Sequence, residues 1–133
     1  MDRLVLELTE HEIVSNYEQL MHEISALRTQ GIRIAIDDAG AGYSGLQQIV
    51  KLSPDIIKLD MSLTSNIDTN IVRKSLATAL LQFANETKAL IIAEGVETEG
   101  EFATLKLMSV DMVQGYLLGR PLKLKDALAL CNK

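Results

Sequence analysis

The chain has 133 residues, 47% of them hydrophobic, which suits a single globular domain with a buried core. Its formal net charge of −5, the lack of a basic run and an aromatic content of 4% argue against binding a nucleic-acid polymer or an anionic membrane surface. No apolar run approaches the ~18 to 20 residues of a membrane span, the acidic N-terminal stretch does not resemble a signal peptide, and the single Cys131 excludes disulfides within the chain, so we expect a cytoplasmic protein.

Apolar periodicity predicts strands that alternate with helices along the whole chain. Gly31 is placed to end the first helix, and the Ser53-Pro54 pair closes the second, because a residue before proline avoids the helical region. The polar residues 62–70 are expected to form an irregular connection. The expected strands are 4–8, 32–36, 56–60, 90–93 and 112–116, and the expected helices are 17–29, 46–52, 71–86, 99–108 and 125–131.

This alternation predicts parallel βαβ units and therefore an α/β fold. Periodicity alone fits both a doubly wound sheet and part of a (β/α) barrel. Polar residues end nearly every expected strand, and a barrel gathers all its strand ends at one mouth, which favours the barrel. We therefore expect residues 1–133 to form a single domain, a partial TIM-like (β/α) barrel of about five parallel strands with flanking helices. In its helix 71–86, the apolar stripe predicted to face the core is Val72, Leu76, Ala79, Leu80 and Phe83.

The stretch 32–46 is the most informative part of the sequence. An apolar strand runs directly into Asp37 and Asp38, and a loop containing Gly40 and Gly42 follows. Glycines allow the backbone to bend tightly or to approach a ligand closely. The carboxyl ends of parallel strands are where ligands bind in α/β proteins, so a functional site is expected here.

Polar residues near the ends of the strands are predicted to converge. Side chains alternate faces along a strand, and this parity turns one set away from the helix-packing side: Glu7, Asp37, Lys58, Asp60, Glu94 and Gln114. Several carboxylates at one low-dielectric site need positive charge, which Lys58 and divalent cations such as Mg²⁺ or Mn²⁺ could supply. Paired cations are suited to displacement at phosphorus. The alternative is that each of these residues is an ordinary solvated loop residue.

At these residues the chain resembles a known family. The matching segments occur in the family's order: residues 7–10 (Glu-Leu-Thr-Glu), 37–44 (Asp-Asp-Ala-Gly-Ala-Gly-Tyr-Ser), 58–60 (Lys-Leu-Asp), 93–98 (Ala-Glu-Gly-Val-Glu-Thr) and 114–116 (Gln-Gly-Tyr). They resemble the EAL-domain family of bacterial phosphodiesterases. These enzymes linearise the second messenger cyclic di-GMP to pGpG with two Mg²⁺ or Mn²⁺ ions on a TIM-like barrel.

The resemblance implies roles for individual residues. Glu7 would bind the first metal, Asp37 would bridge both metals, and the second metal would be held by Asp38 and Glu94. Lys58 would hold and help to activate the attacking water. The remaining implied roles are support of water or substrate by Gln114, substrate binding by Asp60, and stabilisation of the glycine loop and a dimer contact by Glu10, Glu97, Gly40 and Gly42.

Two departures from the family pattern bear on function. Ala39, Ala41 and Gly45 stand where the family usually has Phe, Thr and Ser. The family's Glu-Ala-Leu signature and a following Asn, which both serve the first metal, do not occur in matching strands here. The sequence therefore resembles the C-terminal part of an EAL domain. Because about five strands cannot close an eight-stranded barrel, we expect the chain alone to be incomplete. Because these ligands of the first metal are missing, we expect the second metal site, formed by Asp37, Asp38 and Glu94, to persist better than the first.

The expected function is hydrolysis of cyclic di-GMP by an intact EAL domain, weakly or not at all by this piece alone. The expected partners are a second copy, through the helix 71–86 and the preceding loop, or covalently attached sensor and signalling domains. Three alternatives remain: an inactive EAL-like module that binds cyclic di-GMP or a protein partner, a metal-dependent barrel enzyme of enolase type, and a non-functional fragment.

Overall fold

Five parallel strands form one sheet in the computed structural model, which describes residues 2–9, 16–39 and 43–131. Their order in the sheet equals their order in the chain, from β1 to β5. A doubly wound sheet would reverse direction at a switch point, whereas the wall of a barrel continues in one direction. The arrangement confirms the predicted α/β fold with parallel strands of a partial barrel. The strands are β1 (Val5–Leu8), β2 (Arg33–Ala39), β3 (Ile56–Leu59), β4 (Leu90–Ala93) and β5 (Met112–Val113).

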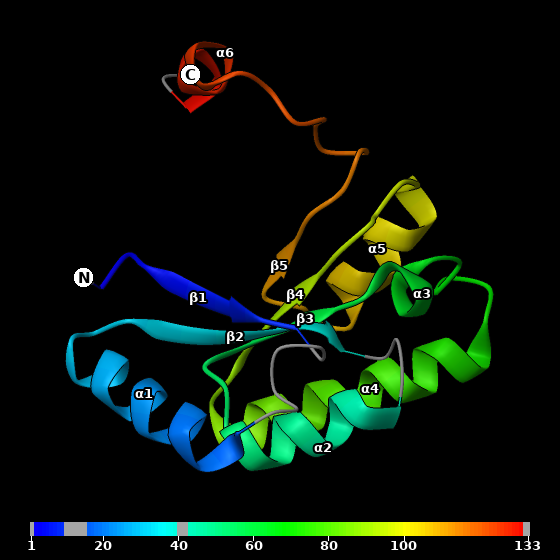
Figure 1. The fold of residues 1–133 in the computed structure, drawn as a ribbon. Coiled ribbons are helices and arrows are strands. Elements are labelled where there is room, and N and C mark those ends of the chain that lie inside the picture. Colours follow the sequence, from blue (N-terminus) through cyan, green and yellow to red (C-terminus); the bar gives the residue numbers. More distant parts are fainter. Residues whose placement is uncertain (1, 10–15, 40–42, 132–133) are drawn as a thin grey trace.

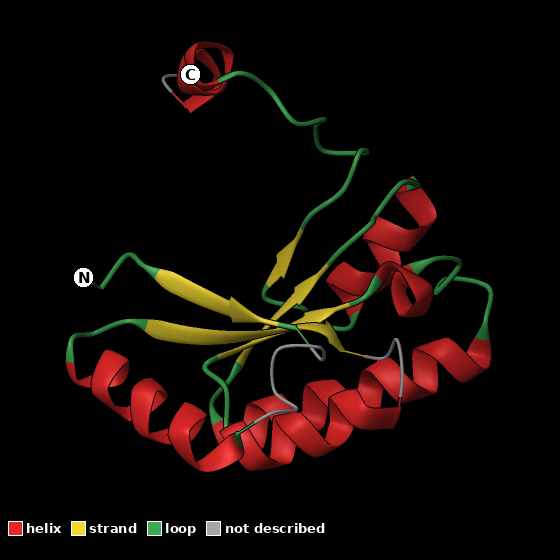
Figure 2. Cartoon of the chain, viewed as in Figure 1, coloured by secondary structure: helices red, strands yellow, loops and turns green. Residues whose placement is uncertain are grey.

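Helices connect the strands and cover one side of the sheet, as right-handed crossovers require (Figure 1). Figure 2 shows the three long helices α1, α2 and α4 along that layer. After β5 the chain leads away from the sheet to α6, which lies apart from the other helices (Figure 1). The helices are α1 (Tyr17–Thr29), α2 (Tyr43–Leu52), α3 (Met61–Thr64), α4 (Ile71–Thr87), α5 (Glu99–Leu107) and α6 (Leu124–Cys131).

The core lies between the sheet and these helices. Each of the first five helices contributes a well-buried aliphatic side chain, Leu63 in the case of the single-turn α3, and the three central strands supply the opposing surface. Burial of such side chains is the main favourable term in folding. The principal members of the core are Ile24, Ile34, Ile36, Ile49, Leu52, Ile57, Leu59, Leu80, Ile91 and Leu105.

Local sequence signals set several element ends. Gly31, at φ +85°, ends α1 in a left-handed conformation that suits glycine, and the N–H of Ile32 reaches back to the carbonyl of Leu27 (3.3 Å). Two aspartates tie the amino ends of strands: Asp55 accepts from the N–H of Ile34, and Asp111 accepts from the N–H of Ile91, both at 2.8 Å. These contacts fix the frame on which the opposite, carboxyl ends of the strands are held.

The predicted buried stripe of α4 is wrong in part. Leu80 is buried and Phe83 packs against the core, but Val72 is 73% exposed, and Leu76 and Ala79 also face solvent. Ala77 and Ala84 complete the buried face instead. Apolar residues occur on more than one face of α4, so periodicity alone could not tell which face meets the sheet. Among the described residues, no helix is long and apolar enough to cross a membrane.

Candidate metal centre

Asp37 and Asp38 occupy a bulge near the end of β2. Ile36 pairs with Ile57 and Ala39 pairs with Leu59, so β2 contains one more residue than β3 between these two pairs. Asp38 adopts a left-handed conformation (φ +60°), which Asp tolerates better than most residues, and its N–H donates to Asp37 Oδ1 at 2.8 Å. Bulges re-aim side chains next to functional sites. The predicted strand ended at Ile36, so the sequence analysis missed this bulge.

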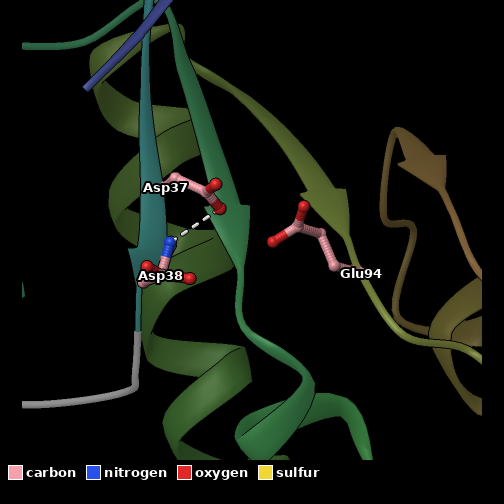
Figure 3. A group of neighbouring side chains, drawn as sticks. All are labelled: Asp37, Asp38 and Glu94. Atoms are coloured by element: carbon pink, nitrogen blue, oxygen red, sulfur yellow. Dashed lines mark hydrogen bonds between the residues drawn. The ribbon is translucent and has the colours of Figure 1, made fainter. Parts of the chain in front are cut away.

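Glu94 completes a cluster of three carboxylates. It follows β4 directly, and Figure 3 shows its side chain pointing toward Asp37, with β3 between the two strands that carry them. One carboxylate oxygen from each of Asp37, Asp38 and Glu94 lies within 4.8 Å of the others, and all three residues are partly buried. Closely placed carboxylate oxygens are the ligands that hard divalent cations prefer. The donor set therefore fits a cation such as Mg²⁺ or Mn²⁺.

Lys58 is the positive charge beside this cluster. Its side chain extends from β3, the residue is only 7% exposed, and its Nζ lies 2.9 Å from Glu7 Oε1 and 2.9 Å from Glu94 Oε1. Burial disfavours the charged form of Lys58, but the hydrogen bonds to Glu7 and Glu94 outweigh it and raise the lysine pKa. Lys58 is therefore an ammonium donor rather than a base. Glu7 meets Lys58 and is not part of the described three-carboxylate cluster.

The pKa values of two carboxyl groups in the cluster, those of Glu94 and Asp38, are raised. Burial raises the pKa of Glu94 to about 7, and the carboxylate of Asp37 adds to this effect, while Lys58 opposes it. Burial also raises the pKa of Asp38, with repulsion from Asp37 and Asp60 contributing. A divalent cation among these oxygens would favour the ionised form of both carboxylates and so oppose both shifts. The electrostatics thus agree with the donor set.

Asp60 has a structural contact as well as a place near the cluster. It is the N-cap of α3, the short helix within the connection that was predicted to be irregular, and its Oδ2 accepts from the N–H of Ser62 at 2.8 Å. Burial works against its charge, but the hydrogen bonds from Ser62 lower its pKa overall. A single-turn helix is too short for apolar periodicity to reveal.

Gln114 lies just beyond β5, which is shorter than the predicted strand 112–116 that included it. Its N–H donates to the carbonyl of Ala93 (2.8 Å), and its carbonyl accepts from the N–H of Val96 (3.1 Å). A cavity of about 400 Å³ opens beside it, next to the carboxylate cluster. The lining residues are Asp60, Met61, Glu94, Gly95, Glu97, Gln114, Gly115 and Tyr116.

Gly115 allows the close approach that positions Gln114. A Cβ atom at Gly115 would lie 2.1 Å from the backbone oxygen of Val96, whereas one at Gly119 would meet nothing within 4 Å. We expect Gly115→Ala to lower the free energy of unfolding by about 1–3 kcal/mol, because the two backbones must separate. Gly119→Ala, the matched control, is expected to change it by less than ~0.5 kcal/mol. Urea denaturation of both variants checks this, and equal effects would contradict it.

The structure therefore brings most of the predicted site together. Glu7, Lys58 and Glu94 form one ion-paired group, Asp37 and Asp38 join Glu94, and Asp60 and Gln114 line the adjoining cavity. Of the predicted loop-stabilising residues, Glu97 is exposed and also lines the cavity. The other three, Glu10, Gly40 and Gly42, lie outside the described residues.

Two residues that the sequence analysis missed support the loop after Glu94. Thr64, fully buried, donates a hydrogen bond to the carbonyl of Glu94. Glu101, 3% exposed, accepts three backbone N–H groups. The Thr98-x-x-Glu101 spacing is a capping-box pattern that could have revealed Glu101, but nothing local marks Thr64.

Comparisons with known proteins show which family and which solved structures the chain is similar to. Residues 1–121 match the EAL domain family. The chain is 38% identical over 123 residues to "Probable cyclic di-GMP phosphodiesterase PdeA" of Escherichia coli, covering 92% of the chain but 17% of PdeA. A complex of Klebsiella pneumoniae BlrP1 with manganese and cyclic di-GMP superposes with a TM-score of 0.84 at 34% identity, over 90% of this chain and 31% of that one.

The EAL domain of Mycobacterium smegmatis DcpA is similar over a larger share of its own length. It superposes with a TM-score of 0.88 at 32% identity, over 95% of this chain and 56% of the DcpA chain. The chain thus spans less than two thirds of each of these relatives. With the family matched over nearly all its residues and the fold shared with solved members, the chain belongs to the EAL domain family.

Proposed function

We propose that this chain supplies the second-metal half of a site that hydrolyses cyclic di-GMP to linear pGpG. The observation that carries the proposal is the cluster of Asp37, Asp38 and Glu94 beside the buried ammonium of Lys58. It is supported by the likeness to a phosphodiesterase and to a manganese and cyclic di-GMP complex. The reaction adds water to one phosphorus, breaks one P–O ester bond and returns a proton to the leaving ribose oxygen.

The proposed cation is Mg²⁺ or Mn²⁺, held by Asp38 and Glu94 and shared through Asp37 with a first metal that Glu7 helps to bind. Cations there would supply positive charge to the phosphate and to the attacking water. The chain's own carboxylates fix where that charge lies. Glu7 and Lys58 meet at 2.9 Å, so the first-metal ligand and the lysine are already adjacent.

Lys58 is proposed to orient the attacking water. An ammonium has three donor hydrogens, and two of them are directed to Glu7 and Glu94. The remaining hydrogen can hold a water oxygen beside the carboxylate cluster. Gln114 and Asp60, which line the cavity of about 400 Å³, are proposed to contact the substrate.

The remaining strands of the domain are proposed to come from elsewhere in a longer EAL protein. The chain covers only 31% to 56% of the BlrP1 and DcpA chains. Attached signalling domains would account for the difference from the larger relatives. We also propose a homodimer contact on α4, where Ile71 and Val72 are 72% and 73% exposed.

The test is cyclic di-GMP hydrolysis with Mg²⁺ or Mn²⁺, by this chain and by a complete EAL domain built around it. We expect linear pGpG from the complete domain and little or none from the chain alone. Binding of cyclic di-GMP without turnover by the complete domain would favour the alternative of an inactive binding module. If the complete domain showed no binding and no turnover of cyclic di-GMP, the proposal would be overturned.

The pKa of Glu94 predicts a pH dependence for Mn²⁺ binding. The cation binds the ionised carboxylate, and because burial raises its pKa to about 7, protons compete with the metal below that pH. We therefore expect the affinity to fall by up to about 10-fold for each pH unit as the pH is lowered from about 7 to about 6. Calorimetry in two buffers of different ionisation enthalpy would measure the affinity and the accompanying proton release. An affinity that stays constant over this range would contradict the assignment.

A further inference from the structure

The loop that follows Glu94 is fastened by one buried carboxylate. Oε1 of Glu101 accepts from the N–H groups of Glu97 (3.2 Å) and Thr98 (3.0 Å). Its second oxygen, Oε2, accepts from the N–H of Asn66 at 2.9 Å. Glu101 thus performs two separable tasks: Oε1 caps the start of α5, and Oε2 ties that start to the connection between α3 and α4.

A second fastening lies at Glu94 itself. The hydroxyl of Thr64, at the end of α3 and fully buried, donates to the backbone carbonyl of Glu94. The N–H of Glu94 donates to the carbonyl of Leu59 (3.0 Å), so both backbone polar groups of this residue are engaged. The side chain of Glu94 is therefore presented from a backbone that neighbouring elements hold in place.

The segment 65–70, to which Oε2 of Glu101 ties the start of α5, itself packs closely. Asn66 adopts a left-handed conformation (φ +56°), Ile67 is fully buried, and the guanidinium of Arg73 donates to the carbonyl of Ser65. A Cβ atom at Gly100 would lie 2.3 Å from Oδ2 of the Asp68 side chain, so α5 packs closely against this segment. Such a segment can act as a rigid support.

We propose that Glu101 and Thr64 are positioning residues that hold Glu94 in register with Asp37 and Asp38 by fastening its loop to the α3–α4 connection. The binding of a cation by Glu94 rests on the proposed function, whereas the hydrogen bonds that hold its loop do not. Partners that orient a metal ligand from behind commonly change affinity by about 10- to 100-fold when they are removed.

Glu101→Gln separates the two tasks of Glu101. Its amide oxygen can still accept from Glu97 and Thr98, whereas its NH₂ group would face the N–H of Asn66, two donors with no acceptor between them. Thr64→Val keeps the volume and removes the hydroxyl donor. The matched controls are Glu99→Gln, an exposed carboxylate in the first turn of α5, and Thr78→Val, an exposed threonine on α4.

Two measurements on the 133-residue chain test the proposal: amide hydrogen exchange without metal, and Mn²⁺ titration calorimetry. We expect Glu101→Gln and Thr64→Val each to raise exchange at residues 94–96 by about 10-fold while α5 stays protected, and to weaken Mn²⁺ binding by about 10-fold. In Glu101→Gln the N–H groups of Glu97 and Thr98 should keep their protection, because the amide oxygen still accepts from them. Glu101→Gln should leave the hydrogen bonds at the start of α5 intact, so the helix should stay protected from exchange. If Glu101 acted only by stabilising α5, the helix itself would lose protection.

The outcomes separate this inference from the proposed function. Unchanged exchange at residues 94–96 in both variants, or effects equal to those of Glu99→Gln and Thr78→Val, would overturn the inference. Faster exchange throughout α5 in Glu101→Gln would also overturn it, because the residue would then act on the helix alone. A wild-type chain that binds no Mn²⁺ would overturn the proposed metal site, and the exchange measurement would still decide the positioning role.

Discussion

Replacing Asp37 by Asn is expected to lower Mn²⁺ affinity by at least ~100-fold and to abolish cyclic di-GMP hydrolysis in a complete EAL domain. Asp37 belongs to the carboxylate cluster with Asp38 and Glu94, and all three offer oxygens within 4.8 Å of one another. The amide has nearly the same shape but no charge, and one of its two terminal atoms cannot bind a cation. Asp37 is also the proposed shared ligand, so one substitution weakens both metal sites.

Mn²⁺ titration calorimetry and an assay for pGpG would measure these two effects. Asp126→Asn is the matched control, because it makes the same charge change at an exposed position on α6. If Asp37→Asn bound Mn²⁺ as tightly as the wild-type chain, the cluster would not be the metal site. If it hydrolysed cyclic di-GMP at the wild-type rate, the proposed function would be wrong.

Lys58→Met is expected to separate catalysis from metal binding. Methionine keeps an unbranched apolar stem but removes the ammonium that contacts Glu7 and Glu94 at 2.9 Å. The attacking water then loses its proposed donor, and we expect hydrolysis in a complete domain to fall by about 10²- to 10⁴-fold. Mn²⁺ affinity at a pH of about 8 should stay the same or rise. The variant lacks the lysine ammonium, which repels the cation and pairs with the carboxylate of Glu94.

Lys106→Met, an exposed lysine in the last turn of α5, is the control for the loss of one positive charge. Measuring hydrolysis and Mn²⁺ affinity on the same preparations keeps the two effects apart. A parallel loss of both would show that Lys58 acts by holding the carboxylates in place rather than on the water. Wild-type hydrolysis by Lys58→Met would remove Lys58 from the mechanism.

Much of the frame follows from local sequence signals. The helix Tyr17–Thr29 and the strand Leu90–Ala93 have the predicted bounds, because the helix has a clear apolar period that ends at Gly31 and the strand is an apolar run that ends at Glu94. The parity of side chains along a strand also predicted that Lys58 and Glu94 would point away from the helix-packing side, and the structure shows them in an ion pair there, since period-2 alternation holds wherever the strand is regular. Strand and helix identity are short-range properties, so the sequence alone determines them.

Other features depend on contacts between distant segments. The bulge at Asp37 and Asp38 arises from pairing with β3, and the exposed face of α4 follows from how the helix packs. The fastening of Glu94 by Thr64 joins residues 30 positions apart, and that of Asn66 by Glu101 joins residues 35 apart.

The sequence by itself therefore determined the α/β alternation, the family and the carboxylates at the strand ends. Only the tertiary structure decided which of those carboxylates share one cluster, which pair with Lys58 and which buried residues hold them there. The physical reason is range: periodicity and capping act over a few residues, whereas register, burial and long-range hydrogen bonds exist only once the sheet has formed.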